Sequence, residues 1–130
     1  MATVTVRDEA PSGRALDTWL LPDLPASITA RELVRLRVRE EVARYNAAVP
    51  EYFRGLVQPT DAEVTLNGYR LPHRRTLDWE KQADTACAAF ARNGFVMLVG
   101  DHQIEELDEV IDLGTDLEVS FVKLVPLVGG

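Results

Sequence analysis

Two glycines close the printed sequence, and the carboxylate of the second is the group with the clearest chemical use. Gly129 and Gly130 follow Pro126, Leu127 and Val128, and no charged segment comes after them. Glycine lacks a Cβ, so its backbone can approach surfaces from which other residues are kept away. We therefore expect residues 125–130 to form a slim arm whose Gly130 carboxylate can be threaded into another protein's nucleotide site.

The residues before the diglycine are apolar, which is unusual for a solvated arm. Leu127 and Val128 follow Pro126, and apolar groups held out in water usually mark a surface that a partner covers. We expect Pro126, Leu127 and Val128 to be the partner-binding part of the arm.

The other residues that could do chemistry form no recognisable catalytic or metal-binding set. Cys87 is the single cysteine, which excludes an internal disulfide or a thiolate cluster, and we expect it in the core. His73 and His102 lie far apart in the sequence, and the acidic run 105–112 is typical of a solvated face. Arg70, Arg74 and Arg75 form the densest basic patch, which suits either a solvated loop or a grip on an acidic partner. With no phosphate-binding loop or nucleophile triad, the sequence predicts no metal, no cofactor and no enzyme activity of its own.

Length and charge restrict the class of protein further. The chain has 130 residues, 46% of them hydrophobic, which suits one domain with a real core. Its net charge of −7 disfavours nucleic acid and acidic membrane surfaces as partners. No apolar run is long enough to span a bilayer, and the N-terminus lacks a signal peptide, so we expect a soluble, cytoplasmic protein.

The first part of the chain predicts a β-hairpin followed by a helix. Thr3–Arg7 and Leu16–Leu20 alternate polar and apolar residues on either side of a Pro-Ser-Gly break. Thr29 and Glu32 have the spacing that satisfies the first N–H groups of a helix. The apolar stripe of this helix comprises Val34, Val38, Val42 and Tyr45, widened by Leu33 and Leu36.

The segment 50–93 predicts an insertion that carries a second helix. Proline and glycine interrupt any period over 50–75, apart from a short strand and turn at Glu63–Gly68. Thr76 is placed to cap the helix, and Asn93-Gly94 is placed to end it. Its predicted apolar face comprises Trp79, Ala83, Ala86, Cys87 and Phe90.

The remaining sequence predicts the strands of a sheet. Phe95–Val99 is a continuous apolar run, typical of a strand covered on both faces, and 100–104 is a turn into a short strand. An acidic connection, 105–115, leads to a last strand, Leu117–Leu124, whose end we expect deep in the sheet. The predicted fold class is α+β, with a mixed sheet packed on a helix and an inserted second helix.

The order of these elements and the ending resemble the ubiquitin-like β-grasp family, which includes ubiquitin-like modifiers and the sulfur carriers of molybdopterin and thiamine biosynthesis. Residues 95–104 resemble the family's third strand, turn and short fourth strand, and Leu117–Leu124 resembles its last strand. Pro126 and the diglycine are placed as in the molybdopterin sulfur carriers. The resemblance implies one ubiquitin-like domain over 1–130, with 50–93 as an insertion and 125–130 as a diglycine tail.

The resemblance also implies a function. An E1-like adenylating enzyme would activate the carboxylate of Gly130, after Gly129. In a sulfur carrier the product becomes a thiocarboxylate for a sulfur-accepting synthase, whereas in a modifier it becomes an amide on a target protein. The alternative is a noncovalent β-grasp interaction module, in which the inserted helix is the contact and the diglycine has no role.

Overall fold

The computed structural model describes residues 2–73, 75–114 and 117–124, which form an α+β fold with two helices and a mixed sheet. The chain divides into two units, one drawn from residues 1–33 and 89–130 and the other from 34–88. The elements are β1 Ala2–Glu9, β2 Ala15–Leu24, β3 Ser27–Thr29, α1 Ala30–Ala48, β4 Tyr52–Phe53, β5 Glu63–Thr65, β6 Gly68–Arg70, α2 Trp79–Ala91, β7 Phe95–Val99, β8 His102–Gln103, β9 Val110–Asp112 and β10 Leu117–Lys123.

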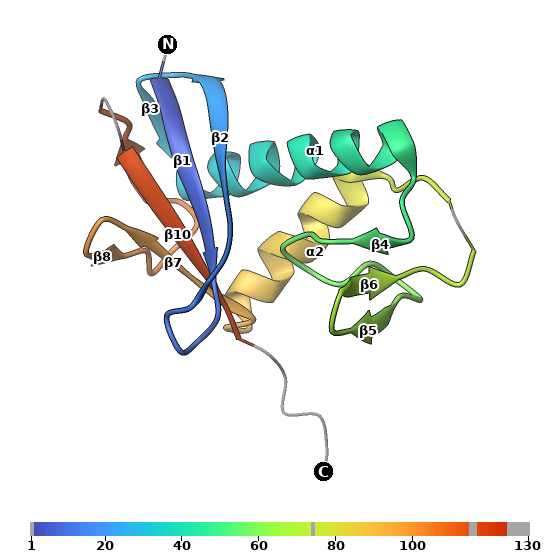
Figure 1. Ribbon diagram of the computed structural model, residues 1–130. Coiled ribbons are helices and arrows are strands. Elements are labelled where there is room, and N and C mark those ends of the chain that lie inside the picture. The colour runs from blue at the N-terminus through green and yellow to red at the C-terminus, as the bar shows by residue number, and fades with distance from the viewer. Residues whose placement is uncertain (1, 74, 115–116, 125–130) are drawn as a thin grey trace. The chain divides into compact units, whose positions relative to one another are not determined.

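The first unit contains a five-stranded sheet in the order β2-β1-β10-β7-β8 (Figure 1). The predicted hairpin is confirmed, because β1 pairs with β2 antiparallel. At the centre, β1 pairs with β10 in parallel, and Val4 lies opposite Leu117. The pairs of β10 with β7 and of β7 with β8 are antiparallel. The sheet is therefore mixed, as the sequence predicts, and its last strand is central.

One face of this sheet is buried and the other is not. Val6, Val119 and Phe121 are fully buried and alternate with half-buried or exposed neighbours. The prediction that Phe95–Val99 is covered on both faces is wrong, because Val96 and Leu98 are only half-buried. The end of β10 is likewise not deep in the sheet: Leu124, just beyond it, is 39% exposed. An apolar residue is thus no proof of burial at these positions.

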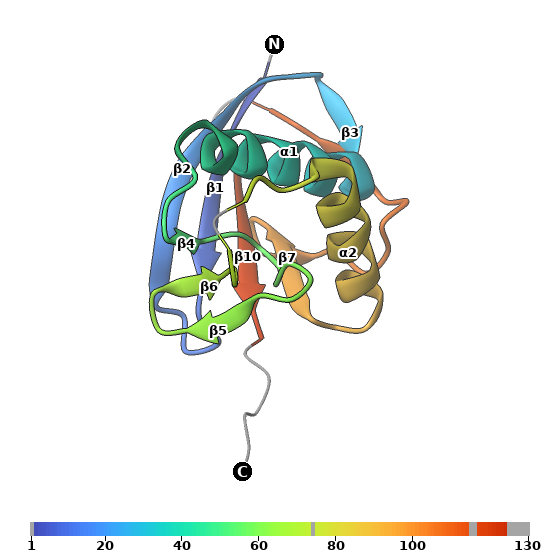
Figure 2. The ribbon, with the colours of Figure 1, turned by 90° about the vertical axis from the view of Figure 1, so that its right-hand side faces the viewer.

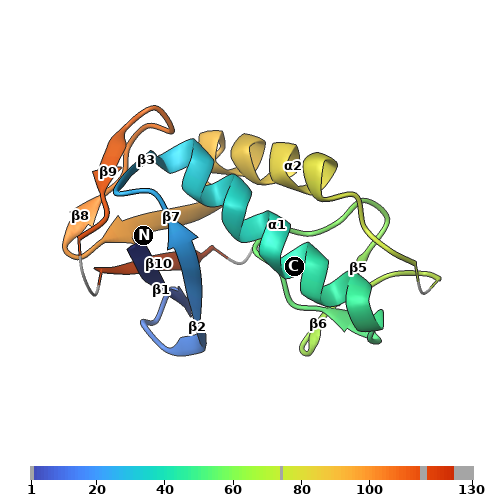
Figure 3. The ribbon, with the colours of Figure 1, turned by 90° about the horizontal axis from the view of Figure 1, so that it is seen from above.

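A second, two-stranded sheet in the same unit was not predicted. β3 pairs antiparallel with β9 (Figure 3). Ile28 lies opposite Ile111, and both residues are buried. The Leu113 N–H donates to the Ala26 carbonyl at 2.8 Å, which continues this pairing. Part of the predicted acidic connection 105–115 is therefore a strand.

The helix termini follow local capping rules. The Glu32 N–H donates to Thr29 Oγ1 at 3.2 Å, which confirms the predicted start of α1. Asn93 has a φ of 59°, and the Gly94 N–H donates to the Ala89 carbonyl at 2.7 Å, so the predicted left-handed end of α2 is also confirmed. The predicted cap at Thr76 is wrong, because Asp78 Oδ1 accepts from the Glu80 N–H at 3.0 Å.

The second unit contains most of both helices and a three-stranded sheet in the order β4-β6-β5 (Figure 2). The predicted apolar stripe of α1 is buried at Val34, Val38, Val42 and Tyr45. An arginine shares this burial: Arg37 is fully buried, and its Nε lies 3.3 Å from Glu41 Oε2. Glu41 Oε1 also accepts from the Leu56 N–H at 3.1 Å.

Candidate functional site

The strand that leads to the diglycine is held on both sides within the five-stranded sheet. β10 lies between β1 and β7 and ends at Lys123, after which the Leu124 N–H donates to the Gly94 carbonyl at 3.3 Å. These pairings fix where the chain leaves the sheet. The residues predicted to carry the chemistry and the partner contact, Pro126, Leu127, Val128, Gly129 and Gly130, lie outside the described residues.

The two histidines belong to different units of the chain. His73 is exposed in the second unit, whereas His102 in the first unit contacts Glu109, close to an ion pair of Arg31 with Asp108. Among the described residues, no group of three or more histidines, cysteines or acidic residues is arranged to hold a metal ion. The acidic run 105–112 is mostly exposed at its charged positions, as predicted for a solvated face.

Arg70 and Arg75 of the predicted basic patch are exposed, and one of them makes a hydrogen bond within the second unit. Arg75 Nη2 donates to the Thr60 carbonyl at 3.0 Å, and Arg70 is exposed on β6. Arg74 lies outside the described residues. The neighbouring Tyr69 is half-buried, and burial first, then the charge of Glu41, raises the pKa of its phenol.

Cys87 is half-buried rather than part of the core, so that prediction is wrong. The buried face of α2 includes fewer residues than predicted. Ala83 and Ala86 are buried, but Trp79 and Phe90 are only half-buried. Gln82 is buried on this helix although its side chain is polar. Its Nε2 donates to the Val57 carbonyl at 2.8 Å, which satisfies the buried amide group.

Two arginine side chains contact the ring of Trp79, and the sequence did not predict these contacts. Arg35 and Arg39 of α1 lie with their Cζ atoms 5.7 and 5.4 Å from the centre of the Trp79 ring. Arg35 also pairs with Asp84 at 2.8 Å, and this hydrogen bond is the main cause of its raised pKa. These contacts join α1 to the start of α2 within the second unit.

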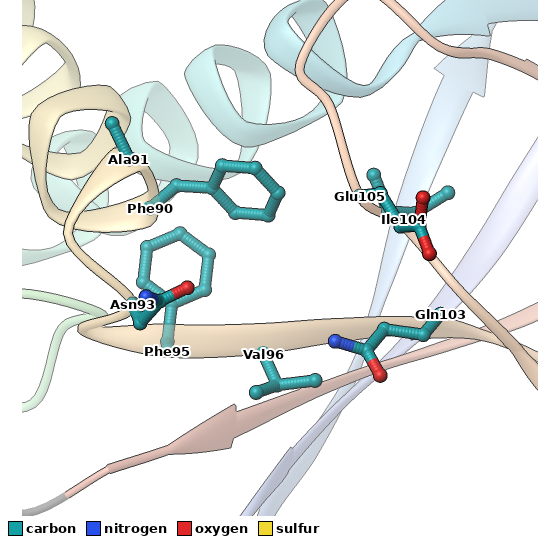
Figure 4. Close-up of a pocket in the computed structure, with 8 residues that line it drawn as sticks. All are labelled: Phe90, Ala91, Asn93, Phe95, Val96, Gln103, Ile104 and Glu105. Carbon is teal, nitrogen blue, oxygen red and sulfur yellow. The ribbon is translucent and has the colours of Figure 1, made fainter.

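A groove beside the first half of β7 was not predicted. Figure 4 shows Phe90 above Phe95 on one side, with Gln103, Ile104 and Glu105 across the gap. Its volume is about 270 Å³. We call it the β7 groove, and its lining residues are Phe90, Ala91, Asn93, Phe95, Val96, Gln103, Ile104 and Glu105. The sequence indicates part of this groove, since the apolar residues Phe90, Phe95 and Ile104 lie beside two predicted turns. That the three side chains meet depends on the tertiary structure, which the sequence does not show.

Comparison with protein-family models, with curated proteins and with solved structures finds no match to this chain. Within the described residues, neither helix is both long enough and apolar enough to cross a lipid bilayer.

Proposed function

We propose that this chain is a ubiquitin-like carrier whose Gly130 carboxylate is adenylated by an E1-like enzyme. The observation that carries this proposal is the order of the five-stranded sheet, in which the first strand and the last described strand lie side by side and parallel at the centre. That order, with a helix after the first hairpin, is the one expected of a β-grasp. The diglycine follows this central strand in the sequence.

The chemistry is an acyl activation followed by acyl transfer. A carboxylate oxygen of Gly130 attacks the α-phosphorus of ATP, and the bond to pyrophosphate breaks, which leaves an acyl adenylate. In the sulfur-carrier branch, sulfide attacks the acyl carbon and AMP leaves, which gives a thiocarboxylate. In the modifier branch, an enzyme thiol attacks and AMP leaves, which gives a thioester; a target amine then attacks this thioester and the thiol leaves, which gives an amide. The activating enzyme supplies the catalytic groups, so the chain itself is the carrier and not the catalyst.

This chemistry requires Gly130 to carry a free carboxylate in the mature protein, which intact-mass measurement of the protein from its native cells tests first. The purified chain is then incubated with ATP, Mg²⁺ and the E1-like enzyme encoded nearest to it. We expect chain-dependent exchange of labelled pyrophosphate into ATP, and a hydroxamate at Gly130 when hydroxylamine traps the adenylate.

Two variants make this test specific. Deleting Gly129 and Gly130 should abolish exchange, whereas Val128→Ala keeps the length of the arm and should retain it. Exchange that survives the deletion, or a native chain that lacks a carboxylate at Gly130, would exclude the proposed chemistry.

A noncovalent interaction module is the second candidate, and two exposed leucines favour it. Leu16 and Leu20 of β2 are 46% and 58% exposed, and β2 lies at the edge of the five-stranded sheet. Exposed apolar groups on an edge strand favour a protein contact. If deletion of the diglycine leaves the protein's activity in cells unchanged, this second candidate is supported instead.

A further inference from the structure

We propose that the β7 groove is a docking site for an extended peptide of a partner protein, rich in lysine or arginine and in apolar residues, which adds to the sheet as a strand along Phe95. This inference does not depend on the chemistry of the C-terminus. It rests on three properties of the groove: an incomplete sheet edge, an apolar lining and an acidic surrounding.

The sheet edge is incomplete because β8 is much shorter than β7. β8 pairs only with Leu98 and Val99, and the Ile104 N–H then donates to the Met97 carbonyl at 2.9 Å. Beyond Ile104 the chain leaves β7, and Glu105 is exposed with no regular structure. The first half of β7 therefore has β10 on one side and the groove on the other.

The backbone groups of Phe95 face the groove. Along a strand, the N–H and C=O groups point alternately to the two neighbouring strands. The Gly94 carbonyl accepts from Leu124 and the Gly100 N–H donates to Glu118, so even-numbered residues face β10. Met97 faces β8, and Phe95 faces the same side. In the described part of the chain, no backbone group pairs with Phe95 there. Phe95 is only 2% exposed, so an added strand must displace the side chains that cover its N–H and C=O groups before it can pair with them.

The lining of the groove suits apolar side chains. Phe95 and Ile104 are each 2% exposed, and the half-buried Phe90 and Val96 flank them (Figure 4). The rings of Phe90 and Phe95 lie 5.8 Å apart between centroids. The volume of about 270 Å³ far exceeds the ~30 Å³ that one water occupies in the liquid, so the groove can admit side chains of a partner. Alternate residues of an added strand would reach it, since they project to the same side.

The charge around the groove selects a basic partner. Glu105 lines the groove, and the exposed Glu106 follows it. The residues of the first unit, 1–33 and 89–130, include 13 Asp and Glu against 5 Lys and Arg, a net charge of 5 − 13 = −8. Such a field attracts cationic segments and repels acidic ones. An extended peptide with alternating lysine and valine meets all three requirements. Its backbone can pair with β7, its valines can enter the apolar groove, and its lysines are attracted by the acidic residues.

The probe is the synthetic peptide acetyl-Ala-Lys-Val-Lys-Val-Lys-Ala-amide, titrated into the ¹⁵N-labelled full chain. We expect saturable amide shifts centred on Phe95, Val96 and Gln103, with a Kd below about 1 mM. Two matched peptides test the mode of binding. Replacing every lysine by glutamate reverses the charge, and replacing the central lysine by proline removes a backbone N–H. Each should bind at least about tenfold more weakly.

Two variants of the chain test the location. Ala91→Trp places a large side chain at the groove and Glu105→Lys reverses its charge, and each should weaken binding about tenfold or more. Ala88→Trp alters an exposed residue of α2 that does not line the groove, so its affinity should match that of the parent. Dispersed amide spectra of the three variants would verify that they fold.

Three results would overturn the inference. The first is the absence of saturable shifts with the lysine peptide. The second is equal binding of the three peptides, or shifts confined to another surface such as the edge strand β2. The third is a concentration-dependent shift at the groove without peptide, which would assign the groove to a second copy of this chain.

Discussion

Replacing Gly55 by alanine should destabilise the second unit mainly through a steric conflict with Phe53, beside a weaker one with Glu41 Oε1 at 3.1 Å. An ideal Cβ on Gly55 would lie 2.1 Å from Phe53 Cζ and 2.2 Å from Cε2. Ordinary contacts begin at 3.4 Å, so the ring must move by about 3.4 − 2.1 = 1.3 Å. The φ of Gly55 is not in the left-handed region, and the conflict is therefore one of space and not of backbone strain.

Phe53 has little freedom to make that movement. Its side chain is 2% exposed and packs edge-on against Tyr45 at a centroid distance of 5.3 Å, with Tyr69 at 6.5 Å. Overpacking of a tight core costs about 1–3 kcal/mol. If the ring is displaced from its site altogether, the loss approaches that of a Phe→Ala change, about 3–5 kcal/mol. We therefore expect Gly55→Ala to lower the free energy of unfolding by at least about 1 kcal/mol.

Urea unfolding followed by fluorescence and by far-UV circular dichroism measures this loss. Gly114→Ala is the matched control, because nothing lies within 4 Å of its added Cβ and its φ is not positive; it should stay within about 0.5 kcal/mol of the parent. Phe53→Leu removes the two ring atoms that collide. In that background Gly55→Ala should lose most of its effect. A Gly55→Ala protein as stable as the parent, or a loss that Phe53→Leu does not reduce, would refute this reasoning.

Three further changes should have separable effects. Asp78→Ala should cost about 1 kcal/mol by removing the cap of α2, and Thr76→Ala should cost almost nothing, as thermal unfolding will show. Glu41→Ala should destabilise by about 3–5 kcal/mol in urea, because it removes a partner of the buried Arg37 and the acceptor of a backbone N–H; Glu41→Gln should lose less. The raised pKa of Tyr69 means that its contribution is present below the unfolded pKa near 10 and is lost as the pH rises through the higher folded pKa. Unfolding between pH 9 and 12 should thus show a steeper loss for the parent than for Tyr69→Phe, and equal slopes would contradict this assignment.

Local signals predicted the elements whose ends are set by neighbouring residues. The hairpin of β1 and β2 follows from alternation, the start of α1 from the Thr29 hydroxyl, and the end of α2 from Asn93 in the left-handed region. The cap of α2 was misplaced because Thr76 and Asp78 are both good capping residues, and composition alone does not rank them.

Tertiary contacts decided the features that the sequence could not predict. β9 has only three residues, and its pairing with β3 joins segments about eighty positions apart, so no local pattern marks it. Arg37 carries a charge that local rules place in water, yet Glu41 lies within 3.3 Å of it and makes burial tolerable. The β7 groove brings together residues from 90 to 105 across two turns. The diglycine was found from the sequence alone, and its residues lie outside the described part of the chain.

The parallel pairing of β1 with β10 has a consequence for synthesis on the ribosome. Val4 and Leu117 are partners although 117 − 4 = 113 positions separate them. β1 leaves the exit tunnel before β10, and its neighbour on one side does not exist until about a hundred further residues have been translated. During that interval only the contact with β2 can form, and such non-local pairings are slow to close. A nascent chain of this protein therefore presents to chaperones a strand that is unpaired along one edge, and premature stop codons before β10 should yield an aggregation-prone product.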